Sequence, residues 1–172
     1  TGVKISQGDY IWFFDADDFT SFKSVENIIN QIEKTTPELI YLKPVIYHEA
    51  RQDYDDWHDV EICDIAFGEE HIKTLKDAPE LIASEVSVCR CVISRSLIEK
   101  INLTFEEKIH WEDIYPHLQL IDNANEIVYL DTLGTYFYRV ESECEQITSA
   151  RGETRLGVVK EFEKCFKYAD KH

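Results

Sequence analysis

A short apolar run, Tyr10-Ile-Trp-Phe-Phe14, constrains the fold of this chain more than any other feature of its sequence. Aromatic and β-branched residues without a polar interruption are typical of a strand that is buried on both faces of a sheet. The run ends abruptly in the carboxylates of Asp15, Asp17 and Asp18. Because open α/β sheets bind ligands beyond the carboxyl ends of their strands, we expect a functional site at these residues.

Helical and strand patterns alternate along the rest of the chain. Apolar residues at helical spacing predict helices over 21–35, 94–101, 112–123 and 156–169, with shorter helices broken at Pro79 over 69–84. Apolar and β-branched runs predict strands over 38–47, interrupted at Pro44, and over 86–92, 126–130 and 135–140. This alternation without an internal repeat predicts a single α/β domain over residues 1–172, with a mixed sheet flanked by helices.

The charge of the chain excludes some classes of partner. Its 34 acidic and 18 basic side chains give a formal net charge of -16, which repels nucleic acid and anionic lipid surfaces. No apolar run is long enough to span a bilayer, and no secretory signal is recognisable. The densest acidic stretch is interpreted as a solvated surface loop or the extension of a hairpin, and it contains Asp53, Asp55, Asp56, Asp59, Glu61 and Asp64.

The cysteines give no sign of a zinc or redox site, because none of the five stands in C-x-x-C spacing. Cys89 and Cys91 share one face of a predicted strand. We interpret them as small buried apolar residues in a reducing compartment.

The carboxylates after the first strand allow three interpretations. Strand alternation would point Asp15 and Asp17 in the same direction and Asp18 in the other. Two converging carboxylates suit Mg²⁺ or Mn²⁺ carrying a diphosphate, because such ions keep open positions for phosphate oxygens. Alternatively, Asp15 is the phosphoryl-accepting nucleophile of a phosphatase of the haloacid dehalogenase type. As a third possibility, the aspartates only cap the following helix.

A second acidic group, Glu112 and Asp113, follows Trp111 at the start of a predicted helix, where acidic residues are ordinary. Trp111 fits either a core position or a surface on which a sugar stacks. Arg139 fits either a phosphate contact or an ion pair with one of the many acidic residues. A non-catalytic carbohydrate-binding module that stacks sugars on Trp57, Trp111 and Tyr54 is therefore a further alternative.

Several of these motifs occur in the order and approximate spacing of family 2 glycosyltransferases, which the chain resembles over nearly its whole length. The motifs are Gly8-Asp-Tyr-Ile-Trp-Phe-Phe-Asp-Ala-Asp-Asp18, Phe105-Glu-Glu, His110-Trp-Glu-Asp113, Tyr136-Phe-Tyr-Arg139 and Ile147-Thr-Ser149. The resemblance implies a GT-A fold and an inverting, metal-dependent transfer from a nucleoside-diphosphate sugar, such as a UDP-sugar, to a carbohydrate acceptor. It also implies a role in surface-polysaccharide synthesis at the cytoplasmic side of the membrane.

The resemblance also implies a role for each candidate residue. Asp15 and Asp17 are expected at the Mn²⁺ or Mg²⁺ ion, with Asp17 the direct ligand, and Asp15 and Asp18 near the ribose or sugar of the donor. Asp113 is expected to be the catalytic base, since a sugar hydroxyl must lose its proton as it attacks the anomeric carbon. Glu112 and Trp111 are expected at the acceptor, and Arg139 at a phosphate.

The sequence departs from the family at two places. Residues 1–14 do not supply the family's first nucleotide-binding strand and loop, so we expect a domain truncated at its N-terminus that is inactive by itself. The missing strands would leave an apolar sheet edge exposed, and we expect a homodimer through that edge. Residues 141–146 form an unusually acidic version of the loop that, in the family, closes over the donor.

Overall fold

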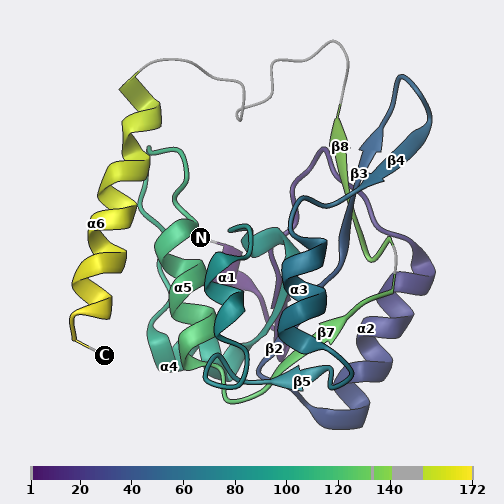
Figure 1. The fold of residues 1–172 in the computed structure, drawn as a ribbon, viewed down its shortest axis with the longest axis horizontal. Helices are drawn as coiled ribbons and strands as arrows, with labels where there is room; N and C mark the ends of the chain where they lie inside the picture. The colour runs from purple at the N-terminus through teal and green to yellow at the C-terminus, as the bar shows by residue number, and fades with distance from the viewer. Residues whose placement is uncertain (1, 133, 141–152, 172) are drawn as a thin grey trace.

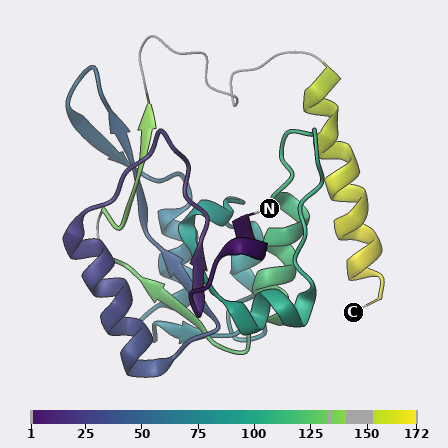
Figure 2. The same cartoon turned by 180° about the vertical axis from the view of Figure 1, so that it is seen from behind.

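The computed structural model describes residues 2–132, 134–140 and 153–171. The chain forms a mixed α/β structure in which two sheets are flanked by helices (Figure 1). Seen from behind, the C-terminal helix and the first long helix lie on opposite sides of the molecule (Figure 2). The sequence therefore predicted the fold class correctly.

The larger sheet has five strands in the order β1-β6-β2-β7-β5, with antiparallel pairs except for the parallel pair β2 and β7. These strands are β1 (Tyr10–Trp12), β2 (Leu39–Leu42), β5 (Ile72–Lys73), β6 (Cys91–Ser94) and β7 (Ile127–Leu130). The smaller sheet has the order β4-β3-β8. Its strands are β3 (Pro44–His48), β4 (Asp53–Asp56) and β8 (Tyr136–Val140).

The α-helices flank these sheets, and short 3₁₀ helices connect some of the elements. The α-helices are α1 (Gly2–Ile5), α2 (Phe22–Thr35), α3 (Val60–Phe67), α4 (Arg95–Ile101), α5 (Ile114–Asn123) and α6 (Gly157–Ala169). The 3₁₀ helices are η1 (Pro79–Ala83), η2 (Val88–Arg90) and η4 (Glu153–Leu156). No helix in the described ranges is both long enough and apolar enough to cross a bilayer.

Local patterns placed most elements correctly. Ser21 caps α2 by accepting a hydrogen bond from the Ser24 amide, and Ser94 caps α4 by accepting one from the Leu97 amide. The predicted interruption near Pro44 separates β2 from β3. The segment 69–84 contains the 3₁₀ helix η1 beginning at Pro79, but its first part forms β5 in place of a predicted helix.

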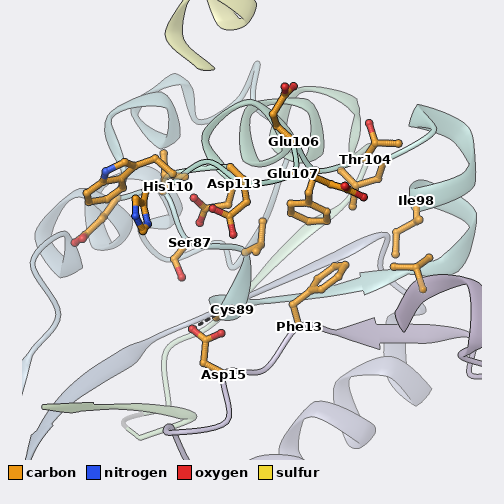
Figure 3. Close-up of a pocket in the computed structure, with 18 of the residues that line it drawn as sticks. Phe13, Asp15, Ser87, Cys89, Ile98, Thr104, Glu106, Glu107, His110 and Asp113 are labelled. Carbon is orange, nitrogen blue, oxygen red and sulfur yellow. Dashed lines mark hydrogen bonds between the residues drawn. The ribbon is translucent and has the colours of Figure 1, made fainter. Parts of the chain in front are cut away.

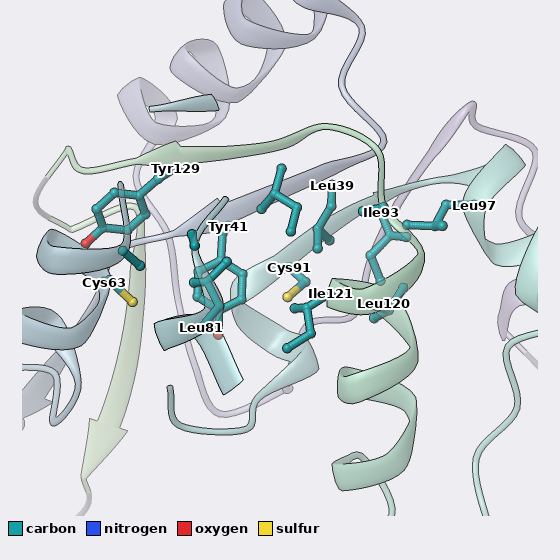
Figure 4. Close-up of a cluster of buried hydrophobic side chains, with 14 of the residues drawn as sticks. Leu39, Tyr41, Cys63, Leu81, Cys91, Ile93, Leu97, Leu120, Ile121 and Tyr129 are labelled. Atoms are coloured by element: carbon teal, nitrogen blue, oxygen red, sulfur yellow. The ribbon is translucent and has the colours of Figure 1, made fainter. Parts of the chain in front are cut away.

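The core lies on both faces of β2, which is buried at every position. Leu39 and Tyr41 point into a cluster with residues of α3, α4 and α5 (Figure 4), whereas Ile40 and Leu42 pack with Ile28 of α2. This alternation explains why the sequence of β2 is continuously apolar.

The prediction of a fully buried strand over 10–14 was wrong. β1 ends at Trp12 and is only partly buried, and Phe14 is exposed. β1 is an edge strand that pairs with β6 alone in the described structure, so one of its sides has no sheet neighbour. This agrees with the expected sheet edge, whereas the homodimer through it stays a prediction.

The acidic stretch is not simply a solvated loop. Its first part forms β4, which is exposed and pairs antiparallel with β3, as the hairpin alternative predicted. Asp59, however, is 3% exposed at the start of α3. Both carboxylate oxygens of Asp59 accept hydrogen bonds from Nη1 of Arg90, at 2.8 and 2.7 Å. Arg90 itself is fully buried and lies over the ring of Tyr41. A buried ion pair thus joins α3 to the segment that precedes β6.

Candidate functional site

A pocket of about 1120 Å³ opens between the end of β1 and the segment 104–113, which connects α4 to α5. Phe13 and Asp15 line it on the side of β1, and residues 85–89 line it beside them. Asp113, His110 and Glu107 lie on the side opposite Asp15 (Figure 3). The pocket therefore brings together the two acidic groups that are far apart in the sequence.

Asp15 meets Cys89 at the base of this pocket. The thiol of Cys89 donates a hydrogen bond to Oδ2 of Asp15 across 3.4 Å (Figure 3). Burial, with the nearby charge of Asp15, raises the pKa of the Cys89 thiol well above its usual range, so the group stays protonated and can donate. Cys89 lies in η2, so the predicted strand position was wrong for Cys89, whereas Cys91 is fully buried in β6 as expected.

The predicted direction of the neighbouring aspartates was also wrong. The strand ends at Trp12, and the amide of Asp18 donates to the carbonyl oxygen of Asp15 at 3.2 Å, so the chain makes a turn there. Strand alternation consequently does not extend to these residues. Asp15 lines the pocket, whereas Asp17 is exposed outside it.

Asp18 is buried and hydrogen-bonded to residues of β8. Its side chain is 7% exposed, accepts a hydrogen bond from the hydroxyl of Tyr136 and accepts another from the Arg139 amide at 2.8 Å. Burial is the largest cause that raises the pKa of Asp18, and both hydrogen bonds oppose it. Asp18 does not line the pocket, so the predicted donor contact would require this network to rearrange.

Asp113 is the acidic residue on the opposite wall. It occupies the N-cap position of α5, but its side chain makes no capping hydrogen bond. Burial raises the pKa of Asp113 to about 6, and the charges of Glu112 and Asp15 add to this shift. The amides of Asp113 itself and of Val88 lower the pKa and limit it. A carboxylate with this pKa takes up a proton near neutral pH.

Two of the three aromatic residues in the sugar-stacking alternative, Trp57 and Trp111, line the same pocket. Trp111 is 37% exposed and has a positive φ of 69°, which is an uncommon conformation for a bulky residue. Trp57 is 8% exposed and packs edge to face with Tyr138 at 5.5 Å. Its Nε1 has no hydrogen-bond partner among the described residues. Tyr54 lies on β4, away from the lining residues.

The sequence did not identify Tyr138, His58 or Glu85 as lining residues. They come from β8, from the segment before α3 and from the segment before η2. No single motif connects them, because long-range contacts bring these segments together: β3 pairs with β8, Trp57 packs on Tyr138, and the amide of Glu85 donates to Oδ2 of Asp59 at 2.6 Å.

Arg139 lies on β8 outside the pocket. Its Nη1 is 3.9 Å from Oε1 of Glu49, and its guanidinium lies over the ring of Phe19. The structure therefore favours the ion pair over the phosphate contact. Residues 141–149, which carry the predicted donor loop and the Ile147-Thr-Ser149 motif, lie outside the described residues.

The described residues of the pocket supply only some of the ligands that a divalent cation needs. Within the described ranges, no group of at least three His, Cys, Asp and Glu side chains is arranged to hold a metal ion. Asp15 nevertheless presents an exposed carboxylate to the pocket, next to the second exposed carboxylate of Asp17. Such a donor set fits Mg²⁺ or Mn²⁺ when phosphate oxygens of a substrate supply further ligands.

Comparisons with known proteins match this chain to glycosyltransferases. The sequence model described as "Glycosyl transferase family 2" matches residues 1–101, starting at the first residue of the chain. The "Uncharacterized glycosyltransferase EpsJ" of Bacillus subtilis (strain 168) is 28% identical over 140 residues, which cover 81% of this chain and 40% of EpsJ. The expected N-terminal truncation stays a prediction.

Solved structures with the same fold come from Staphylococcus aureus. TarS 1-349 in complex with UDP-GlcNAc superposes with a TM-score of 0.66 and 18% identity, covering 87% of this chain and 40% of that one. The same protein in complex with UDP gives a TM-score of 0.60, covering 81% of this chain and 38% of the other. At this identity the likeness establishes the fold only.

Proposed function

Because the chain belongs to glycosyl transferase family 2, we propose that it carries the catalytic pocket of an inverting transferase that moves a sugar from a nucleoside diphosphate to a carbohydrate acceptor. The observation that carries this proposal is the position of Asp113. It is an uncapped carboxylate with a raised pKa that faces Asp15 across a pocket of about 1120 Å³.

Asp113 is the general base in this proposal. The acceptor hydroxyl transfers its proton to the Asp113 carboxylate while its oxygen forms a bond to the anomeric carbon of the donor. The bond from that carbon to the diphosphate oxygen breaks at the same time, and the nucleoside diphosphate leaves with the electron pair. A single displacement of this kind inverts the anomeric centre, and the base accounts for about 10²- to 10⁴-fold of the rate.

Asp15 marks the donor end of the pocket. Its carboxylate is the described group best placed to hold Mn²⁺ or Mg²⁺ against the diphosphate, with Asp17 beside it on the same turn. The ion, when bound, offsets the negative charge that grows on the leaving diphosphate. The protein residues provide its carboxylate ligand, and without the ion the negative charges of Asp15, Glu112 and Asp113 would repel the diphosphate.

The aromatic side of the pocket is the acceptor end. Trp57, Tyr138 and Trp111 line the pocket together with Asp113. Aromatic rings stack against the apolar faces of sugars, and the unpartnered Nε1–H of Trp57 is a donor that a ligand oxygen can satisfy. Glu112 also lines this region and would contact the acceptor or orient the base.

Because the chain belongs to glycosyl transferase family 2, a glycosyltransferase is preferred over a phosphatase of the haloacid dehalogenase type. The non-catalytic module remains distinguishable by experiment, because a module would bind sugars without needing Asp113. A place in surface-polysaccharide synthesis at the cytoplasmic side of the membrane stays a prediction that follows from the family resemblance.

Calorimetric titration of UDP and UDP-GlcNAc in the presence of Mn²⁺ tests the donor end in the native gene product. We expect Asp15→Asn to weaken binding by about tenfold or more, because a charge-assisted ligand is lost. Asp56→Asn is the matched control, since Asp56 is exposed on β4 and does not line the pocket. Asp17→Asn is compared as the second carboxylate of the turn. A larger loss in Asp17→Asn would contradict the placement of the donor and would favour Asp17 as the direct metal ligand.

A further inference from the structure

The N-terminus of α5, where Asp113 lies, is capped in an unusual way. A helix begins with backbone amides that have no partner within the helix, and an aspartate at the N-cap normally accepts from the amide of the second or third helical residue. In α5 the second residue is Tyr115 and the third is Pro116. Pro116 has no amide hydrogen.

The amide of Tyr115 is taken by another helix. It donates to Oε2 of Glu161, a residue of α6 that is fully buried, at 3.3 Å. The amide of Ile114 donates to the carbonyl oxygen of Trp111, also at 3.3 Å. The first hydrogen bond within the helix runs from His117 to the carbonyl oxygen of Asp113 at 2.8 Å. Every amide that Asp113 could cap therefore has another acceptor or carries no hydrogen.

α6 is held against the pocket wall by two further contacts. Lys164 donates to Oε1 of Glu161 at 2.6 Å and to Oε2 of Glu106, a pocket residue, at 2.8 Å. At the start of α6, a Cβ atom on Gly157 would lie 2.9 Å from the carbonyl oxygen of His110. The helix therefore approaches the segment 104–113 closely, which places the buried side chain of Glu161 beside Tyr115.

We propose that Glu161 is a positioning residue for the pocket: it caps α5 in place of Asp113 and so leaves the Asp113 carboxylate turned toward the pocket, where the amide of Val88 donates to it. This inference rests on the proposed function, in which Asp113 is the base. Pro116 contributes to the same effect, because it has no amide hydrogen at the third helical position, which Asp113 would otherwise cap. Glu161 lies outside residues 1–101, which the family model matches.

The prediction that follows concerns the proton affinity of Asp113. The charged groups that face Asp113 are Glu112 beside it and Asp15 on the opposite wall, with the thiols of Cys89 and Cys91 below. If Glu161 is removed, Asp113 can turn toward the amide of Tyr115. There it becomes a helix cap, and the amide and the helix dipole stabilise its charged form.

The test compares Glu161→Ala and Glu161→Gln in the native gene product. We expect Glu161→Ala to lower the Asp113 pKa by about one unit, because the carboxylate exchanges the amide of Val88 for that of Tyr115 at the helix N-terminus and moves away from the charge of Asp15. The Asp113 pKa is followed by NMR of the carboxyl carbon, assigned by its loss in Asp113→Asn. The rate of transfer should fall about tenfold or more, because the base leaves its productive position. Glu161→Gln should keep a pKa near the wild-type value, because its amide oxygen still accepts from Tyr115.

Pro116→Ala provides a second test that leaves Glu161 and its ion pair intact. It restores an amide at the third helical position, and we expect a lower Asp113 pKa there as well. An unchanged Asp113 pKa in both Glu161→Ala and Pro116→Ala would overturn the inference. Because the NMR titration does not need turnover, this result is separate from the proposed function, which fails if Asp113→Asn keeps its transferase activity.

Discussion

The thiol of Cys89 donates to the carboxylate of Asp15 across 3.4 Å, on the wall of the pocket that faces Asp113. The contact connects the turn after β1 with the 3₁₀ helix before β6. It also occupies one oxygen of the residue that we assign to the donor end. A cation that binds Asp15 must compete with this hydrogen bond.

Cys89→Ala should therefore strengthen the binding of Mn²⁺ in the presence of UDP. A hydrogen bond to a charged group contributes about 1.5 to 3 kcal/mol, and a weak thiol donor less, so we expect a gain of about three- to tenfold. Calorimetry on the native gene product measures it, with Cys165→Ala on α6 as the control. Weaker binding in Cys89→Ala would show that the thiol assists the site.

Asp113→Asn should raise the stability of the protein while it lowers activity. The folded-state pKa of Asp113 is about 6, above the ordinary value of 3.8, so the folded protein binds this proton more tightly than the unfolded chain. The charged form consequently destabilises the fold, and stability falls as pH rises through this window. The neutral amide removes this cost, and we expect a gain of about 1 to 3 kcal/mol at pH near 8 by urea unfolding. Equal stability of variant and wild type near pH 8 would contradict the raised pKa.

Breaking the buried ion pair of Arg90 and Asp59 should lower the free energy of unfolding more than breaking an exposed ion pair. Arg90→Met leaves the Asp59 carboxylate buried without its partner, which costs about 3 to 5 kcal/mol. The double variant Arg90→Met/Asp59→Leu should recover much of this loss, because no unpaired charge remains. Urea unfolding measures both, with Arg51→Met in the exposed pair with Asp53 as a control that changes little. A small loss in Arg90→Met alone would show that water reaches Asp59.

His117 should make the fold sensitive to acid. It is buried next to Tyr41 and Ser87, and burial with the charge of Arg90 lowers its pKa to about 4 from 6.5. The unfolded chain therefore binds this proton more tightly, so stability is lost as pH falls below about 6.5 toward 4, by about 2 to 4 kcal/mol. His117→Gln stays neutral and keeps both a donor and an acceptor. The difference in unfolding free energy between it and wild type should change over this pH range, and a constant difference would refute the prediction.

Local signals in the sequence were sufficient for most of the elements. Ser21 and Ser94 precede apolar residues at helical spacing, and both cap the helices that were expected there. The strands over 126–130 and 135–140 were predicted to within a residue or two of β7 and β8. Local patterns alone marked only Asp15 as a candidate, and the resemblance to family 2 glycosyltransferases brought Asp113 forward as well, although the two residues are far apart in the chain.

Long-range contacts account for what the sequence did not predict. Asp59 is surrounded by other acidic residues, so only its distant partner Arg90 explains its burial. Asp18 is occupied by Tyr136 and the Arg139 amide, which a pattern of neighbouring aspartates cannot reveal. The predicted apolar face of α6 is exposed at Phe166, whereas the polar Glu161 is buried against α5. In each case the tertiary partner decides the outcome.

The release of UDP from UDP-GlcNAc tests the central claim most directly, since that claim makes Asp113 the base of a sugar transfer. The assay uses the native gene product with Mn²⁺ and a mixture of oligosaccharide acceptors, and compares wild type with Asp113→Asn. We predict that acceptor-dependent release by wild type falls as pH drops below about 6, and that Asp113→Asn loses about 10²- to 10⁴-fold at neutral pH. Undiminished acceptor-dependent release in Asp113→Asn would contradict the account.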